Sequence, residues 1–152
     1  MGGRFVGLSG RTVVAAALAL ASVAAPPVAL AQFEVVATPP AGSPQRRAIL
    51  DALRPAIEAR LGPDIEFVVR SIDIRGGWAV VTADPQRRGG RAIDARRYFP
   101  ADDLEFMDGI TVTAVMRFQG GRWRHVQHAI GATDVWYCGG VMTGEVARRF
   151  GC

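Results

Sequence analysis

The sequence predicts an α+β domain in which an N-terminal helix packs on an antiparallel sheet and a disulfide holds a short C-terminal helix. Three observations lead to this fold class. Apolar residues recur at helical spacing over 43–61, two apolar stretches are each interrupted by a Gly-Gly pair, and the chain has two cysteines. A chain of 152 residues can bury a core of its own, and a covalent link adds to its stability.

Residues 1–31 have the layout of a secretory signal peptide. Two arginines precede an apolar run over 13–25, and a small-residue Ala-Leu-Ala cleavage site ends at Ala31. The run is too short to cross a membrane as a helix, and no longer one follows. We therefore expect a mature chain that begins at Gln32, has no membrane span and works in the periplasm or as a secreted protein.

The rest of the chain is expected to form one domain. Residues 32–42 are predicted to be a linker, in which residues 33–37 can pair as an edge strand. Residues 43–152 are predicted to be a single α+β domain with a long loop at 84–109.

The composition argues against a nucleic-acid partner. All eighteen basic residues are arginine and there is no lysine or asparagine, which is typical of GC-rich codon usage. Without the two arginines of the leader, sixteen arginines face fourteen acids, so the expected charge of the mature chain is only about +2. The RRGG sequence at 87–90 therefore does not indicate an RNA-binding box.

The expected helix begins after Ser43, which is its N-cap, with Pro44 in the first turn. Gly62 and the proline that follows it end the helix. Pro55 lies inside the pattern and removes a backbone hydrogen bond, so we expect a kink between Asp51 and Pro55. The apolar side chains on the face that a sheet should cover are Ile49, Ala52, Leu53, Ala56, Ile57 and Leu61.

Two hairpins are expected to supply the sheet. In the first, a three-residue turn over 75–77 places Ile74 opposite Trp78 and Ile72 opposite Val80, which leaves one face apolar.

The second hairpin has a two-residue turn over 120–121. This turn pairs Phe118 with Trp123. Ile110, Val112, Ala114 and Met116 then lie on the same face as that pair.

The loop at 84–109 is expected to be partly ordered, with a short helix that begins at Pro100 and is acidic in its first turn. Its carboxylates allow a calcium site or ion pairs with nearby arginines. The spacing lacks the alternating acids and central glycine of a calcium loop, so we expect a solvated, ion-paired loop. The carboxylates are Asp102, Asp103, Glu105 and Asp108, and the arginines are Arg87, Arg88, Arg91, Arg96 and Arg97.

The two histidines lie three residues apart in a segment that is predicted to be a strand. Positions three apart in a strand point to opposite faces, so a two-histidine metal site is not expected. His125 should lie on the core face, and His128 should lie opposite Thr113. If a pocket forms, His128 is its most suitable polar group, with Asp73 and Asp134 as further candidates.

Cys138 allows two interpretations, a nucleophile near the histidines or half of a disulfide. Cys152 ends a short expected helix that Thr143 caps and whose apolar stripe is Met142, Val146 and Phe150. An exported chain with two cysteines in this arrangement favours a disulfide. Closing that ring is worth about 3 kcal/mol.

The stretches RRAILDALRP, FVVRSIDIRGGWAVVTADPQR and DGITVTAVMRFQGGRWRHVQHAIGATDVWYC resemble small exported bacterial proteins whose function is uncharacterised. The order helix, hairpin, long loop, hairpin also resembles cystatin-like and NTF2-like α+β domains. In those domains a helix packs on a curved antiparallel sheet. The resemblance implies a fold, and function does not follow from a fold.

Two functional hypotheses remain. The first is a non-catalytic binding or accessory module for an envelope protein or a small ligand, because no triad order, metal spacing or cofactor loop stands out. The second is an NTF2-like enzyme that binds a small molecule between sheet and helix. His128 would then work with Asp73 or Asp134 in acid–base chemistry. Neither hypothesis calls for a cofactor or a metal.

Overall fold

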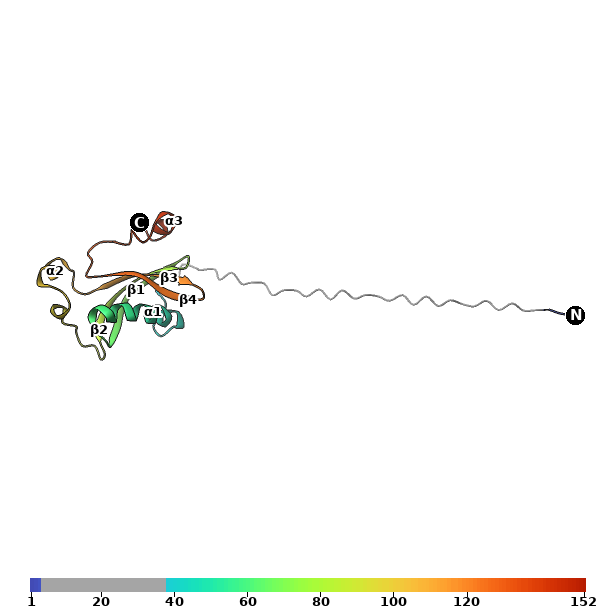
Figure 1. The fold of residues 1–152 in the computed structure, drawn as a ribbon, viewed down its shortest axis with the longest axis horizontal. Coiled ribbons are helices and arrows are strands. Elements are labelled where there is room, and N and C mark those ends of the chain that lie inside the picture. Colours follow the sequence, from blue (N-terminus) through green and yellow to red (C-terminus); the bar gives the residue numbers. More distant parts are fainter. Residues whose placement is uncertain (4–37) are drawn as a thin grey trace. The chain divides into compact units, whose positions relative to one another are not determined.

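The computed structural model describes residues 1–3 and 38–152 (Figure 1). The expected signal peptide, apart from residues 1–3, and the expected strand at 33–37 lie outside the described residues. The helices and strands of the described part all belong to the second of two compact units, Ala31–Cys152. In chain order they are α1 (Pro44–Leu61), β1 (Ile65–Arg75), β2 (Trp78–Arg87), the 3-10 helix η1 (Ala95–Arg97), α2 (Ala101–Phe106), β3 (Val112–Gln119), β4 (Arg122–Ile130) and α3 (Gly144–Arg149).

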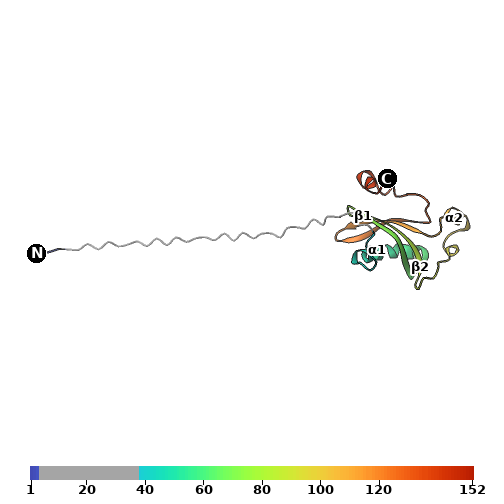
Figure 2. The ribbon, with the colours of Figure 1, turned by 180° about the vertical axis from the view of Figure 1, so that it is seen from behind.

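The four strands form one antiparallel sheet in the order β1-β2-β3-β4. α1 lies against one face, which we call the helix face, and α3 lies on the other side, over the outer face (Figures 1 and 2). The predicted α+β fold is therefore confirmed. In the part of the chain that the structure describes, no helix is both long and apolar enough to cross a membrane.

α1 begins and ends where the sequence predicts. The Ser43 hydroxyl accepts a hydrogen bond of 3.3 Å from the Arg46 amide, and the chain leaves the helix at Gly62. The helix continues through Pro55, which is exposed to solvent. Its fully buried side chains, Ile49, Leu53, Ile57 and Leu61, lie four residues apart and form the core together with Ile72, Ile74, Val81, Val112, Ala114 and Met116 of the sheet.

The first hairpin has a different register from the one expected. Arg75 pairs with Trp78 and Ile74 pairs with Ala79, so the turn has two residues and the predicted three-residue turn is wrong. Gly76 and Gly77 have φ values of 55° and 79°, which suit the two-residue turns that match strand twist. A shift of one residue in the register moves every side chain of β2 to the opposite face of the sheet. Trp78 and Val80 therefore lie on the outer face and not on the helix face.

The second hairpin has the expected register. Phe118 pairs with Trp123 across a two-residue turn, and their ring centroids are 5.4 Å apart. The expected apolar side chains of β3 lie in the core below α1.

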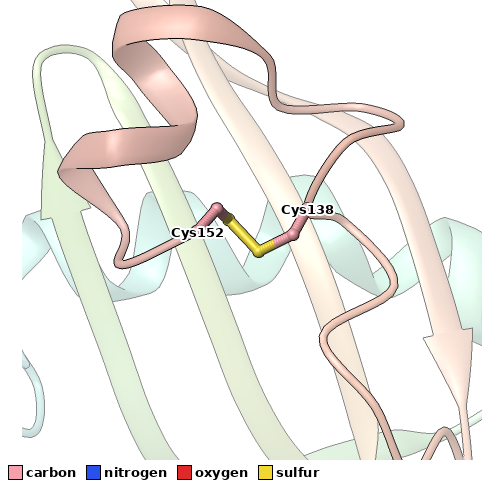
Figure 3. Close-up of a disulfide and its surroundings, with 2 residues drawn as sticks. All are labelled: Cys138 and Cys152. Carbon is pink, nitrogen blue, oxygen red and sulfur yellow. A yellow bond between two sulfur atoms is a disulfide. The ribbon is translucent and has the colours of Figure 1, made fainter.

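The C-terminal segment, residues 131–152, covers part of the outer face. Val80 and Val115 are buried there against Met142 and Ala147, with a surrounding rim of Trp78, Trp136, Tyr137, Val141, Val146 and Phe150. Cys138 and Cys152 form a disulfide with an S–S distance of 1.93 Å, so the predicted pairing is confirmed. Figure 3 shows the bond joining the loop before α3 to the chain end after it. Cys138 is therefore not a free nucleophile.

The long loop is partly ordered, as expected, but its start and its ion pairs differ. β2 continues to Arg87, and α2 forms the predicted acidic helix. The carboxylates of 102–108 are exposed, and within the described residues no ion pair joins them to the five neighbouring arginines. Arg88 instead lies 4.0 Å from Asp64. The expected ion pairs are not formed, because Arg87, Arg88, Arg91 and Arg97 lie near residues 63–64 after α1.

Candidate functional site

The two histidines of the chain lie side by side on the helix face. His128 Nδ1 lies 3.0 Å from His125 Nε2, and the ring centroids are 5.0 Å apart. His125 pairs with Met116 and His128 pairs with Ala114, and both of these partners belong to the core below α1. The structure therefore brings together two side chains that the sequence placed on opposite faces.

A β-bulge in β4 causes this difference. Val115 pairs with Gln127 while its neighbour Met116 pairs with His125, which leaves Val126 as an extra residue in β4. An extra residue shifts the alternation of side chains by one position, so residues three apart point to the same face. The expected pairing of His128 with Thr113 was wrong for the same reason.

Burial lowers the pKa of both imidazoles, and neighbouring groups add to this effect at His128. Partial burial lowers the pKa of His125 below its usual value. Burial also lowers the pKa of His128, and the nearby His125 and the positive charge of Arg60 lower it further. Since neither ring has a carboxylate partner in the described part of the chain, nothing there favours the charged form.

The other two predicted site residues lie elsewhere. Asp73 lies on the outer face opposite Val80, and its carboxylate pairs with Arg75 at 2.9 Å. Asp134 is exposed in the loop after β4. The arrangement brings His128 to His125 and does not bring it to Asp73, so the histidine–carboxylate pair that acid–base chemistry needs is not formed by these two residues.

A second feature is a concavity of about 480 Å³ beside the end of α1, which we call the arginine concavity. Its wall is formed by the end of β2, by the loop between β2 and α2, and by Pro63 and Asp64 in the connection from α1 to β1. The lining residues are Pro63, Asp64, Arg87, Arg91, Ala92, Ile93, Asp94, Arg97 and Tyr98.

Arg87 is the lining residue with the most hydrogen bonds to the rest of the fold. Its guanidinium donates hydrogen bonds to the carbonyl oxygens of Leu61, Gly62 and Pro63 and to the Tyr98 hydroxyl. Leu61 is the last residue of α1 and Gly62 is its C-cap, and a helix has unpaired acceptors and a partial negative charge at this end. Arg87 is thus used by the fold, and it fixes the position of the loop against the helix.

Arg91 and Arg97 do not bind the end of α1 in this way. Both are exposed, and neither takes part in an ion pair within the described residues. The Arg91 carbonyl accepts from the Arg87 amide at 2.8 Å, which closes the loop that carries Arg91. Arg97 ends η1, whose first turn the Asp94 side chain caps.

The sequence did not single out Arg91, Arg97 or Tyr98 as site residues. The cluster of arginines around Gly89-Gly90 could have indicated an anion-binding loop. The concavity also needs residues 63–64, however, which are about two dozen positions away in the sequence. Spacing along the chain does not show such a contact.

Comparisons with known proteins add no assignment: no protein-family model, curated protein or solved structure matches the chain.

Proposed function

We propose that this chain is an exported, non-catalytic binding module that holds an anionic group of a small ligand or an envelope protein in the arginine concavity. The observation that carries the proposal is that two exposed arginines, Arg91 and Arg97, line a concavity in which Arg87 binds the end of α1. Guanidinium is the side chain best suited to bind planar carboxylates or phosphates through two hydrogen bonds.

The two carboxylates of the concavity leave this positive charge available. Asp64 lies near Arg88 at 4.0 Å, and the Asp94 side chain accepts from the Arg96 amide at 3.2 Å. Both acids thus have partners outside the Arg91–Arg97 pair. An anion that enters the concavity therefore meets two arginines that form no ion pair within residues 38–152.

The packing of the helix face supports a binding module over an enzyme with a sheet-and-helix pocket. The space between α1 and the sheet is filled by side chains without solvent exposure, among them Leu53, Ile57 and Met116. An NTF2-like pocket would need that volume for its ligand.

Export is supported by the leader pattern over 1–31 and by the Cys138–Cys152 disulfide. Structural disulfides persist in oxidising compartments such as the periplasm and the cell exterior. The proposed site of action is therefore the cell envelope or the medium.

A titration followed by backbone amide NMR shifts tests the proposal. Inorganic phosphate and succinate serve as the phosphate and carboxylate probes, each at constant ionic strength. We expect shifts confined to Asp64 and residues 87–98, and saturation with one of the two probes. An Arg91→Gln/Arg97→Gln variant should lose this response.

The matched control is Arg122→Gln/Arg124→Gln, which removes the same charge from exposed positions on β4. Binding through the concavity predicts that the control responds like the wild type. Equal losses in both double variants, or shifts spread over all exposed arginines, would show only nonspecific attraction and would refute the proposal.

A further inference from the structure

His125 and His128 are the only histidines in the chain, and the bulge at Val126 places both on one face of the edge strand β4. Bulges recur beside functional sites because an extra residue re-aims a side chain. Here the effect is that two imidazole nitrogens from the same strand lie 3.0 Å apart.

We propose that His125 Nε2 and His128 Nδ1 together bind one divalent transition-metal ion, and that Cu²⁺ is the preferred ion. This site is separate from the arginine concavity and does not depend on it.

The distance between the two nitrogens carries the proposal. Imidazole nitrogens lie about 2.0–2.1 Å from a bound metal, so two of them 3.0 Å apart subtend an angle of about 90° at the ion. A tetrahedral site needs about 109°, for which the nitrogens would be about 3.3 Å apart. An angle near 90° fits adjacent positions of a tetragonal site, which Cu²⁺ and Ni²⁺ prefer.

Binding needs one rearrangement of protons within the pair. In the structure one of the two nitrogens donates to the other, so that ring must shift its proton to its second nitrogen before both can bind a metal. The tautomer shift releases no proton, and rotation of the rings about χ2 must then turn both lone pairs toward the ion.

Both side chains are partly exposed, so a metal can reach them and waters can complete its coordination. Arg60 is the charged group that acts on His128 from α1, and its positive charge opposes a cation. Removing that charge should therefore strengthen metal binding, which a merely structural histidine pair would not predict.

The test is a Cu²⁺ titration of the full chain, purified without a histidine tag and with its disulfide intact, followed by calorimetry and electron paramagnetic resonance. We expect one Cu²⁺ bound with two imidazole nitrogens, with Ni²⁺ and Zn²⁺ binding more weakly in that order. His125→Gln and His128→Gln should each weaken binding by at least about tenfold, because even the loss of a supporting residue costs that much.

Three further variants make the result decisive. Gln127→Ala changes the neighbouring residue on the outer face and should bind like the wild type, while Arg60→Gln should bind more tightly. The His125→Gln/His128→Gln variant measures what the amino terminus and backbone bind. Melting curves establish that each variant is folded. Absence of wild-type binding above that baseline, a spectrum with fewer than two imidazoles, or histidine variants that bind like the wild type would overturn the proposal.

Discussion

The guanidinium of Arg75 donates a hydrogen bond of 2.6 Å to the backbone carbonyl of Arg149, seventy-four positions away. It also pairs with Asp73 and lies 5.7 Å from the centre of the Phe150 ring. The tip of the first hairpin is thus joined to the last turn of α3. This contact and the disulfide hold a helix of six residues, which is too short to be stable alone.

Reduction of the disulfide should lower the free energy of unfolding by about 2–4 kcal/mol, because the unfolded chain regains the freedom of a ring with a sequence separation of 14. Chemical denaturation with and without reductant measures this loss. Cys138→Ser/Cys152→Ser should match the reduced protein. Amide exchange should become faster in α3 and stay slow in α1. If protection from exchange were lost in both helices together, the disulfide would not act on the C-terminal segment alone.

Gly77→Ala and Gly121→Ala should each lower the free energy of unfolding by about 1 kcal/mol. Both glycines have positive φ, 79° and 74°, where a β-carbon is strained although no atom lies within 4 Å of its position. Gly140→Ala is the matched control, since its φ is ordinary and its nearest atom is 3.7 Å away. Thermal unfolding of the three variants measures the difference, and an equal effect at Gly140 would argue against strain at the turns.

Arg87→Gln should destabilise the protein by about 1–3 kcal/mol, because carbonyls at the end of α1 lose a charged donor. Arg88→Gln, one residue later, removes an exposed charge 4.0 Å from Asp64 and should change stability by less than about 0.5 kcal/mol. Urea titrations of the two variants give the comparison. Similar losses would mean that net charge, and not the contact with the helix end, is what matters.

Asp84 should make stability depend on pH in the acid range. Burial alone raises the pKa of this carboxyl, but hydrogen bonds from Arg70 and Thr111, each of 2.7 Å, and the charge of Arg70 outweigh it, so its pKa lies below the usual value. The folded state then binds the proton less readily than the unfolded state. Its contribution is present at neutral pH and is lost as the pH falls below about 4.

Asp84→Asn should therefore be less stable than the wild type at pH 7, by well under 1 kcal/mol because the pair with Arg70 is partly exposed. The difference should shrink as the pH falls toward 3. Melting temperatures of both proteins between pH 3 and 7 check this, and a difference that does not vary with pH would exclude an electrostatic origin.

Three of the predictions that rested on local patterns were confirmed. The buried stripe of α1, the Phe118–Trp123 pairing and the disulfide each follow from residue types at short range, such as the Ser43 cap or a Gly-Gly turn. Their physical causes act over a few residues, so the sequence displays them directly.

The features that sequence analysis missed come from single-residue shifts and from distant contacts. A turn of two residues instead of three moved Trp78 to the outer face, and one extra residue at Val126 moved His128 next to His125. The apolar pattern of the sequence does not reveal the first of these shifts. Trp78 and Val80 are apolar although they face away from α1, because they pack in a second apolar cluster under the C-terminal segment. The arginine concavity joins the end of α1 to the loop after β2, which only the folded chain brings together.

The bulge in β4 also affects how the molecule meets other copies of itself. Within the described residues β4 pairs with β3 alone, so its far side presents unpaired amide and carbonyl groups that invite strand addition. Val126 breaks the even spacing of those groups, and Arg122 and Arg124 place like charges where a second identical strand would align. The extra residue that brings the two histidines together therefore also protects this edge of the sheet against edge-to-edge aggregation.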